Sequence, residues 1–309
     1  MFTPATFLTE LYVSVDTFCQ TQLPPEEHAG RPPALDRSEV VTLAIFGQWA
    51  EFPSERAFYR YACRHLRPCF PRLPARPQFN RSLRRCQEAI TAFALFLGQT
   101  LATGDDRAFE VIDGTGVATR NAKRRGRGWL AGQADIGACT RLGWYEGVRL
   151  LLAVTPSGAV TGWGFGPAAT NDRVLAETFF AARATPHPGL AGVGTPTSDR
   201  YVADMGFTGR DCEARWAALY GAVVVCPPQS DSLRAWPKPL RRWLAGIRQV
   251  IETVNDRLLT TCRLGRERPH ALDGLQARLA AKVGLHNFCV WLNRQVGRAD
   301  LAMADLLDW

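Results

Sequence analysis

The sequence predicts an α/β fold, in which a mixed five-stranded sheet flanked by helices follows an all-helical N-terminal domain. Two observations carry this prediction. Apolar side chains recur at helical spacing up to about residue 105, and short apolar runs typical of strands begin after it. From there the elements follow the order three strands, helix, strand, helix, strand, helix, which is typical of one mixed sheet. We therefore expect two domains, residues 1–105 and 106–309.

The N-terminal domain is predicted to contain at least three helices. Asp36 and Glu39 have the spacing of a capping box ahead of the apolar run 40–46. A second helix is expected to start at Pro53-Ser54, and a third, longer one runs from about Asn80. The third helix has a basic beginning, with Arg76, Arg81, Arg84 and Arg85. This region could be a helix-turn-helix that reads DNA or a plain helical bundle with a solvated basic face, and both interpretations stay open.

The second domain is predicted from five short apolar runs and four helical patterns. The strands are expected at 109–119, 147–155, 159–165, a short run that ends at Asp204, and 222–226. The helices are expected at 172–183, 208–219, a helix that carries Glu252, and 271–296. Asn171-Asp172 is interpreted as the cap of the first of these helices.

Composition points to a globular protein with an anionic partner. The chain has 309 residues, 46% of them hydrophobic and 21% charged, which is enough apolar surface for a core. Its formal net charge of +8 favours nucleic acid as a partner. The nine cysteines are an odd number without a C-x-x-C pair, which indicates a reducing compartment. No apolar run reaches the roughly 18 residues of a membrane helix, and we expect a cytoplasmic protein without a signal peptide.

One group of metal-binding residue types lies in the N-terminal region. It consists of Cys63, His65, Cys69 and Cys86. Their spacing fits no common structural zinc site, so we interpret them as ordinary helix residues.

Three carboxylates stand in settings that suit a two-metal site. Asp113 and Asp204 each follow a short apolar run and precede a glycine closely, and Glu252 lies on a long helix. If the two strands are neighbours, both aspartates reach the same edge of the sheet. Such a set can hold two Mg²⁺ ions and cut or join phosphodiester bonds. Taken singly, either aspartate could instead cap a turn.

The helix that carries Glu252 has two distinct faces. Its apolar stripe consists of Leu240, Leu244, Ile247, Ile251, Val254 and Leu258, and a second face carries Arg241, Arg248, Glu252 and Asp256. Arg248 and Glu252 could form a surface ion pair, which is worth only about 0.3 kcal/mol in this orientation. A metal-binding glutamate beside a phosphate-binding arginine explains the two residues better.

A basic segment follows the first predicted strand. It contains Arg120, Lys123, Arg124, Arg125 and Arg127, interleaved with small residues. Flexible basic loops contact phosphates without reading sequence, and a merely solvated loop is the alternative. The sequence has no P-loop, no G-x-S-x-G elbow and no H-E-x-x-H motif.

Together these segments resemble bacterial insertion-sequence transposases of the DDE class, which have an RNase H-like catalytic core. The resemblance rests on the segments 71–74, 79–81, 111–115, 144–149, 203–207 and, most strongly, Arg248-Gln249-Val250-Ile251-Glu252-Thr253-Val254, followed by 280–282 and 292–294. It implies that Asp113, Asp204 and Glu252 are the metal-binding catalytic triad and that Arg248 is the arginine such enzymes carry before the glutamate. The chain departs from the pattern at Ala245, Leu259 and Met205, where relatives often have tyrosine, lysine and lysine.

The resemblance implies a DNA transposase that cleaves the ends of its element and transfers them into target DNA. The implied cofactor is Mg²⁺, as two ions, with Mn²⁺ as a substitute. The implied partners are double-stranded DNA, both terminal inverted repeats and target, and a second copy of the chain in the synaptic complex. Arg81, Arg84 and Arg85 are the candidates for recognising the repeats. Two alternatives remain: an RNase H-like nuclease without strand transfer, and a catalytically dead DNA-binding regulator.

Overall fold

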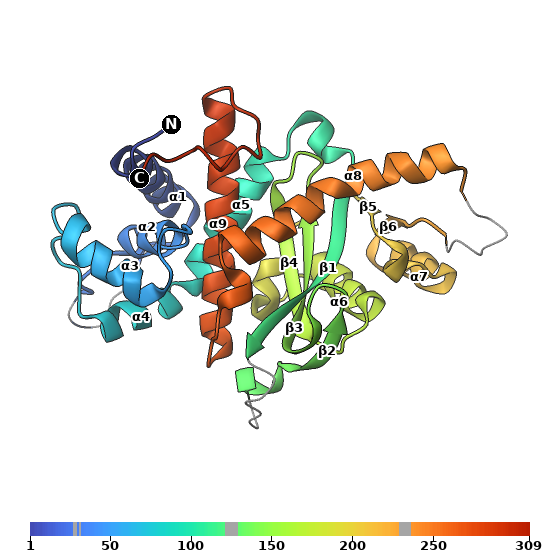
Figure 1. Ribbon diagram of the computed structural model, residues 1–309, viewed down its shortest axis with the longest axis horizontal. Helices are drawn as coiled ribbons and strands as arrows, with labels where there is room; N and C mark the ends of the chain where they lie inside the picture. Colours follow the sequence, from blue (N-terminus) through green and yellow to red (C-terminus); the bar gives the residue numbers. More distant parts are fainter. Residues whose placement is uncertain (27–29, 31, 121–128, 229–235) are drawn as a thin grey trace. The chain divides into compact units, whose positions relative to one another are not determined.

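The structure, a computed structural model, divides into two compact units that are described separately. It describes residues 1–26, 30, 32–120, 129–228 and 236–309 (Figure 1). The first unit consists of Met1–Ala94, Thr261–Arg263 and Asp273–Trp309, and the second consists of Leu95–Thr260 and Leu264–Leu272. By contacts, the last 37 residues of the chain (273–309) group with the N-terminal helices, whereas the sequence places them in the predicted domain 106–309.

The first unit is helical. It contains α1 (Pro4–Gln22), α2 (Arg37–Phe46), α3 (Glu55–Tyr61), α4 (Arg76–Arg85), the start of α5 (Gln87–Leu101) and nearly all of α9 (Leu272–Gln295). The predicted capping box is present at α2, where Asp36 and Glu39 each accept from the other's backbone N–H. Ser54 caps α3, as the sequence predicts.

The predicted third helix is wrong as a single element. The backbone leaves helical geometry at Cys86 (φ −87°, ψ 11°), and α4 ends there before α5 begins. Position 86 is neither glycine nor proline, so the spacing of apolar residues gave no sign of this break.

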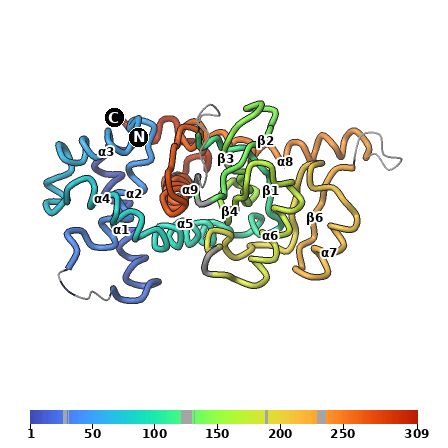
Figure 2. Tube along the Cα trace, turned by 90° about the horizontal axis from the view of Figure 1, so that it is seen from below, coloured from blue at the N-terminus to red at the C-terminus, as the bar shows by residue number. Residues whose placement is uncertain are grey.

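The core of the first unit joins the two ends of the chain. Phe7 of α1 packs edge-on against Phe288 of α9, with ring centroids 5.1 Å apart. The N–H of Phe2 donates to the carbonyl of Leu306 (2.8 Å), and the N–H of Asp308 donates to the carbonyl of Phe2 (2.9 Å). The two termini accordingly lie close together in both views (Figures 1 and 2).

The second unit is built on a mixed sheet flanked by helices, which confirms the predicted RNase H-like α/β class. The strands are β1 (Glu110–Arg120), β2 (Asp135–Cys139), β3 (Gly143–Val154), β4 (Val160–Pro167), β5 (Arg200–Val202) and β6 (Val223–Val225). The strand order is β2-β3-β1-β5-β6, and β4 also pairs with β3. β1 runs antiparallel to β3 and parallel to β5, which in turn runs parallel to β6.

The sheet has one strand more than the sequence predicted. β2 pairs with the beginning of β3, which starts at Gly143 rather than at residue 147. β2 has neither β-branched residues in series nor a clear alternation of apolar and polar positions, so its strand character arises from pairing in the hairpin. Gly143 has a φ of +63°, which suits glycine at the hairpin turn.

Helices cover both faces of this sheet. α6 (Asp172–Ala184) and α7 (Arg210–Tyr220) pack on the face that includes Ile112, in a core with Phe179, Phe180, Phe207 and Trp216. Neighbouring residues of a strand point to opposite faces, so Asp113 points away from Ile112. It meets α8 (Lys238–Asp256), which packs against β1 and β3.

The apolar stripe of α8 is shorter than predicted. Leu244, Ile251, Val254 and Leu258 are buried, but Leu240 is 39% exposed. The beginning of α8 therefore projects beyond the sheet, as Figure 1 shows at the end of the helix beside β5 and β6. In the described part of the chain, no helix is both long enough and apolar enough to cross a bilayer.

Candidate catalytic site

The site starts from the register of two parallel strands. β1 and β5 pair through Glu110–Tyr201 and Val111–Val202. Asp113 and Asp204 each lie two residues beyond the second pair, so both follow the same edge of the parallel pairing. This agrees with the expectation that the two strands are neighbours.

Asp113 does not end its strand, which corrects one detail of the sequence interpretation. β1 continues to Arg120 because β3 pairs with it beyond Asp113. What ends near Asp113 is the parallel neighbour, β5, at Val202. At Asp113, β1 is therefore still paired with β3 on one side, but its pairing with β5 on the other side has ended.

Arg248 of α8 lies between the two aspartates. Its Nη2 is 3.7 Å from Oδ1 of Asp113 and 3.9 Å from Oδ2 of Asp204. One guanidinium thus joins two carboxylates that come from separate strands. The surface ion pair between Arg248 and Glu252, which was the alternative interpretation, is replaced by these contacts.

Asn255 is the second residue of α8 that reaches Asp113. Its Nδ2 donates to Oδ2 of Asp113 at 2.9 Å, and the residue is buried. Oδ1 of Asn255 and Nε of Arg248 are also buried, and neither has a hydrogen-bond partner among the residues that the structure describes. Buried polar groups without partners are uncommon in folded proteins, so these two atoms mark an unusual place beside Asp113.

The electrostatics of Asp113 point to a shortage of positive charge. Burial raises the pKa of its carboxyl from 3.8 to about 7, and the nearby charges of Asp204 and Asp172 add to this, while Arg248 opposes it. A carboxylate that is crowded by other carboxylates in a buried place gains most from a bound cation.

Asp204 has a capping role as well as its place in the site. Its Oδ1 accepts the N–H of Gly206 (2.8 Å) and caps the short 3₁₀ turn Met205–Phe207. The capping interpretation of this aspartate is therefore correct for one oxygen. The other oxygen, Oδ2, faces Arg248.

Glu252 lies on the same helix as Arg248 and Asn255, with an exposed side chain. At 100° per residue it lies about 40° around α8 from Arg248, and Asn255 lies about 20° to the other side. Among the residues that the structure describes, no three His, Cys, Asp or Glu side chains converge closely enough to hold a metal ion. The triad as a set of metal ligands stays a prediction.

Two further charged residues at the site were not singled out from the sequence. Arg149 of β3 donates from Nε and Nη2 to Oδ1 and Oδ2 of Asp172, at 2.7 and 2.6 Å. Asp172 lies beside the segment that carries Asp113, since a Cβ at Gly114 would come within 2.5 Å of its Oδ1. The sequence showed Asp172 only as part of a helix start, and Arg149 only as part of a predicted strand and of the segment 144–149 that resembles the family.

The predicted DNA-binding residues are distributed over both units. Arg120 lies 3.6 Å from Glu146, while Lys123, Arg124, Arg125 and Arg127 lie outside the described residues. Arg81, Arg84 and Arg85 are exposed on or near α4, and Arg84 is 3.7 Å from Asp273.

The group of Cys63, His65, Cys69 and Cys86 was singled out from the sequence. Cys63, Cys69 and Cys86 are free thiols that range from exposed to buried. They form no metal-binding group with His65 among the described side chains.

Comparison with known proteins identifies the family. A family model described as the transposase DDE domain matches residues 106–288, which is more than half of the chain and includes β1 to β6 and α8. Comparisons with curated proteins and with solved structures gave no match. On the strength of the matched family model, this chain belongs to the family of transposases with a DDE domain.

Proposed function

We propose that the protein is a DNA transposase that cleaves the ends of an insertion sequence and joins them to target DNA at one site. The observation that carries the proposal is the convergence of Asp113 and Asp204 on Arg248, just beyond the parallel pairing of β1 and β5. Phosphodiester chemistry needs anionic metal ligands and a cationic group for the phosphate in one place, and this edge of the sheet supplies both.

The residues at this edge fit a divalent cation. Carboxylate and amide oxygens are the ligands that Mg²⁺ prefers, and Asp113, Asp204 and the unpartnered Oδ1 of Asn255 offer them. In this proposal Asp113, Asp204 and Glu252 hold two Mg²⁺ ions, for which Mn²⁺ can substitute. When bound, the ions activate the attacking water or DNA 3′-hydroxyl and neutralise the leaving oxygen.

The other side chains position the reactants. Arg248 binds the phosphate at the site, because a guanidinium presents several donors to phosphate oxygens. Asn255 fixes the orientation of Asp113 through its hydrogen bond. Glu252 completes the site from the flank of the α8 face that carries Arg248 and Asn255.

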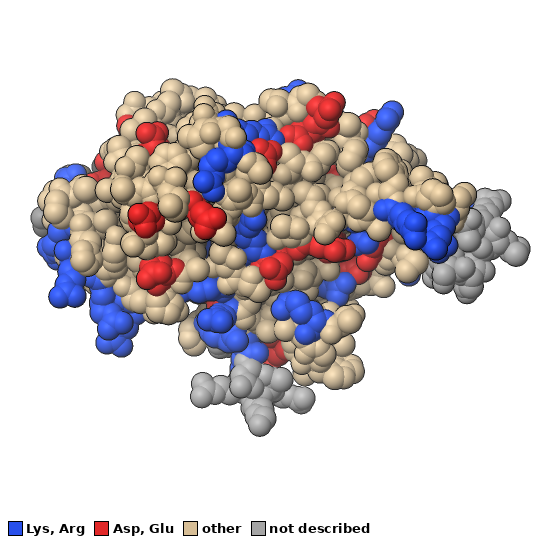
Figure 3. Space-filling model, turned by 45° about the horizontal axis from the view of Figure 1, so that its top comes forward, with Lys and Arg blue, Asp and Glu red and all other residues tan. Residues whose placement is uncertain are grey.

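DNA is proposed to lie along basic surfaces of each unit. In the second unit, Figure 3 shows basic side chains gathered at the projecting start of α8, where Lys238, Arg241 and Arg242 are exposed. Arg120 and the basic residues 123–127 add to the cationic character of this unit. In the first unit, Arg81, Arg84 and Arg85 are the candidates for the terminal repeats, and a second copy of the chain would hold the other end of the element.

Substitution of Glu252 tests the third ligand. We expect Glu252→Gln to lower cleavage and joining at least about 100-fold, because it removes one anionic ligand from the transition-state site. The side chain is exposed, so the free energy of unfolding should not change. The assay uses purified protein, Mg²⁺ or Mn²⁺, and labelled duplexes that carry the sequences flanking the gene.

The matched control for this assay is Asp256→Asn, which removes an exposed carboxylate from the same helix and should leave both products unchanged. Equal activity of wild type and Glu252→Gln would remove Glu252 from the site. Cleavage without joined product would favour a nuclease. Binding without reaction in the wild type would favour a regulator.

The salt dependence of binding tests the arginines of α4. We expect the triple variant Arg81→Ala, Arg84→Ala, Arg85→Ala to bind duplex DNA more weakly and with a shallower slope of log K against log salt, by about 0.9 for each lost phosphate contact. Arg215→Ala is the control, because this arginine is already held by Glu177 through two hydrogen bonds. An unchanged slope in the triple variant would show that these arginines contact no phosphate.

A further inference from the structure

Arg149 and Asp172 form a close, largely buried ion pair that nothing in the sequence indicated. Two hydrogen bonds of 2.7 and 2.6 Å join the guanidinium and the carboxylate side by side. Both side chains are 17% exposed, so this is not a solvated surface pair. α6 does not need Asp172 as its cap either, because Asn171 accepts the N–H of Arg173 (3.0 Å).

The carboxylate of Asp172 is packed between two glycines that flank the catalytic aspartates. A Cβ at Gly114 would lie 2.5 Å from Oδ1 of Asp172, and a Cβ at Gly206 would lie 3.2 Å from its Oδ2. Gly114 follows Asp113 directly. Gly206 donates its N–H to Asp204. One carboxylate therefore lies beside both backbone segments that carry the site, and a side chain at position 114 would push against it.

The same contacts exclude Asp172 as a free fourth ligand in this arrangement. Each of its oxygens accepts a hydrogen bond from Arg149, and the guanidinium balances its charge. A cation could use these oxygens only after the pair separates. The contacts suit a spacer, because the carboxylate is fixed from one side by Arg149 and meets a glycine backbone with each oxygen.

We propose that Arg149 and Asp172 are positioning residues, in which Asp172 sets the separation of the Asp113 and Asp204 segments and Arg149 holds Asp172 in place. The inference rests on the proposed function, since it assigns a role toward the same cation site. Groups that orient metal ligands from behind typically contribute 10–100-fold to metal affinity, about the scale expected here.

The test is the Mn²⁺ affinity of the full-length protein, measured by calorimetry or by the spectroscopic signal of free Mn²⁺. The double variant Arg149→Ala, Asp172→Ala leaves the net charge unchanged, so a loss of affinity reports lost positioning rather than lost charge. We expect the affinity to fall about tenfold. The control is the double variant Glu177→Ala, Arg215→Ala, which removes another pair joined by two hydrogen bonds and also keeps the charge; its affinity should equal that of the wild type.

A second variant covers the case in which the double variant does not fold. Gly114→Ala keeps both charged residues but drives a methyl group against Asp172, and it should weaken Mn²⁺ binding similarly. Wild-type affinity in the folded double variant, or in Gly114→Ala, would overturn the positioning role. Tighter binding in the single variant Arg149→Ala would also overturn it, because Asp172 would then be a competing ligand. Absence of Mn²⁺ binding by the wild type would instead contradict the proposed cation site itself.

Discussion

Asp113→Asn is expected to abolish cleavage and joining while making the metal-free protein more stable at pH 8. The loss of activity should be about 1,000-fold or more, because the substitution removes a proposed metal ligand that would stabilise the transition state by several kcal/mol. The gain in stability follows from burial, which raises the pKa of this carboxyl from 3.8 to about 7. Folding the wild type at pH 8 therefore carries the cost of a buried carboxylate, and asparagine has no such cost.

The pKa shift of Asp113 predicts that the stability advantage of Asp113→Asn grows as the pH rises. The raised pKa contributes stability that is fully present below pH 3.8 and is lost as the pH rises through about 7. The melting temperature of Asp113→Asn minus that of the wild type, in EDTA, should therefore increase from pH 5 to pH 8. Asp211→Asn, an exposed change on α7, should show no such trend. A variant that is less stable than the wild type at pH 8 would mean that Asp113 serves the fold.

Glu110→Ala is expected to cause the largest loss of folding stability. Glu110 is completely buried, and it accepts hydrogen bonds from Arg183 and from the backbone N–H and the hydroxyl of Thr197. Removing it leaves the guanidinium of Arg183 buried without its charge partner. Breaking a buried pair in this way costs about 3–5 kcal/mol.

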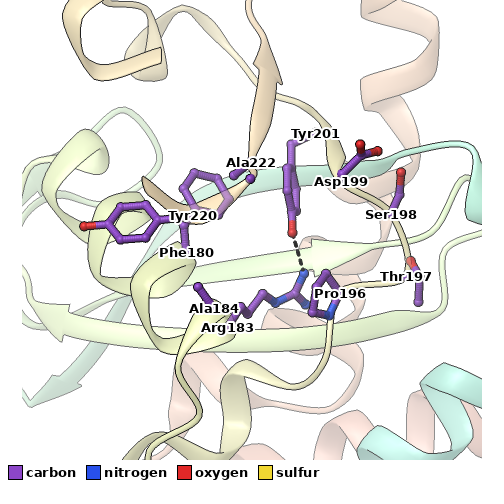
Figure 4. Close-up of a pocket in the computed structure, with 11 residues that line it drawn as sticks. Phe180, Arg183, Ala184, Pro196, Thr197, Ser198, Asp199, Tyr201, Tyr220 and Ala222 are labelled. Atoms are coloured by element: carbon purple, nitrogen blue, oxygen red, sulfur yellow. Dashed lines mark hydrogen bonds between the residues drawn. The ribbon is translucent and has the colours of Figure 1, made fainter. Parts of the chain in front are cut away.

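The other groups around Arg183 do not replace the charge of Glu110. Its Nη1 also donates to the hydroxyl of Tyr201 (3.2 Å), across a pocket that Phe180, Pro196 and Tyr220 help to line (Figure 4). A neutral hydroxyl does not replace a carboxylate. The pocket could admit water to the guanidinium, and the cost would then fall toward the lower end of the range.

Chemical unfolding at constant pH measures this effect as a shift of the midpoint. Glu177→Ala is the matched control, since it removes a partly exposed glutamate that is also paired with an arginine, and its shift should be much smaller. Replacing both Glu110 and Arg183 by leucine should recover much of the loss, because no unpaired charge then remains. A small shift for Glu110→Ala would contradict the role of this pair in the stability of the sheet.

Much of the fold could be predicted because local signals coincided with tertiary structure. The capping box at Asp36 and the cap at Asn171 are short-range patterns, and both helices begin where these patterns place them. The order of strands and helices was sufficient for a mixed sheet. β2 and the break at Cys86 escaped prediction because pairing and packing, rather than local residue types, define them.

The candidate site divides in the same way. Asp113, Asp204 and Arg248 could be proposed from strand ends, helix faces and family resemblance, and the structure places them together. Asn255 could have been suspected, because it lies seven residues, two helical turns, after Arg248. The link between Arg149 and Asp172 could not, since it joins a strand to a helix start across 23 positions and depends on the absence of side chains at Gly114 and Gly206.

The division into two units affects the order in which they can fold during synthesis, because the chain is made from its N-terminus. The last residue of the second unit is Leu272, whereas the first unit needs Asp273–Trp309 as well as Met1–Ala94. The sheet that carries Asp113 and Asp204 can therefore complete its fold first, while α1 to α4 still lack α9. A chain that terminates shortly after residue 272 would keep the sheet that carries Asp113 and Asp204 and would leave its N-terminal helices without α9.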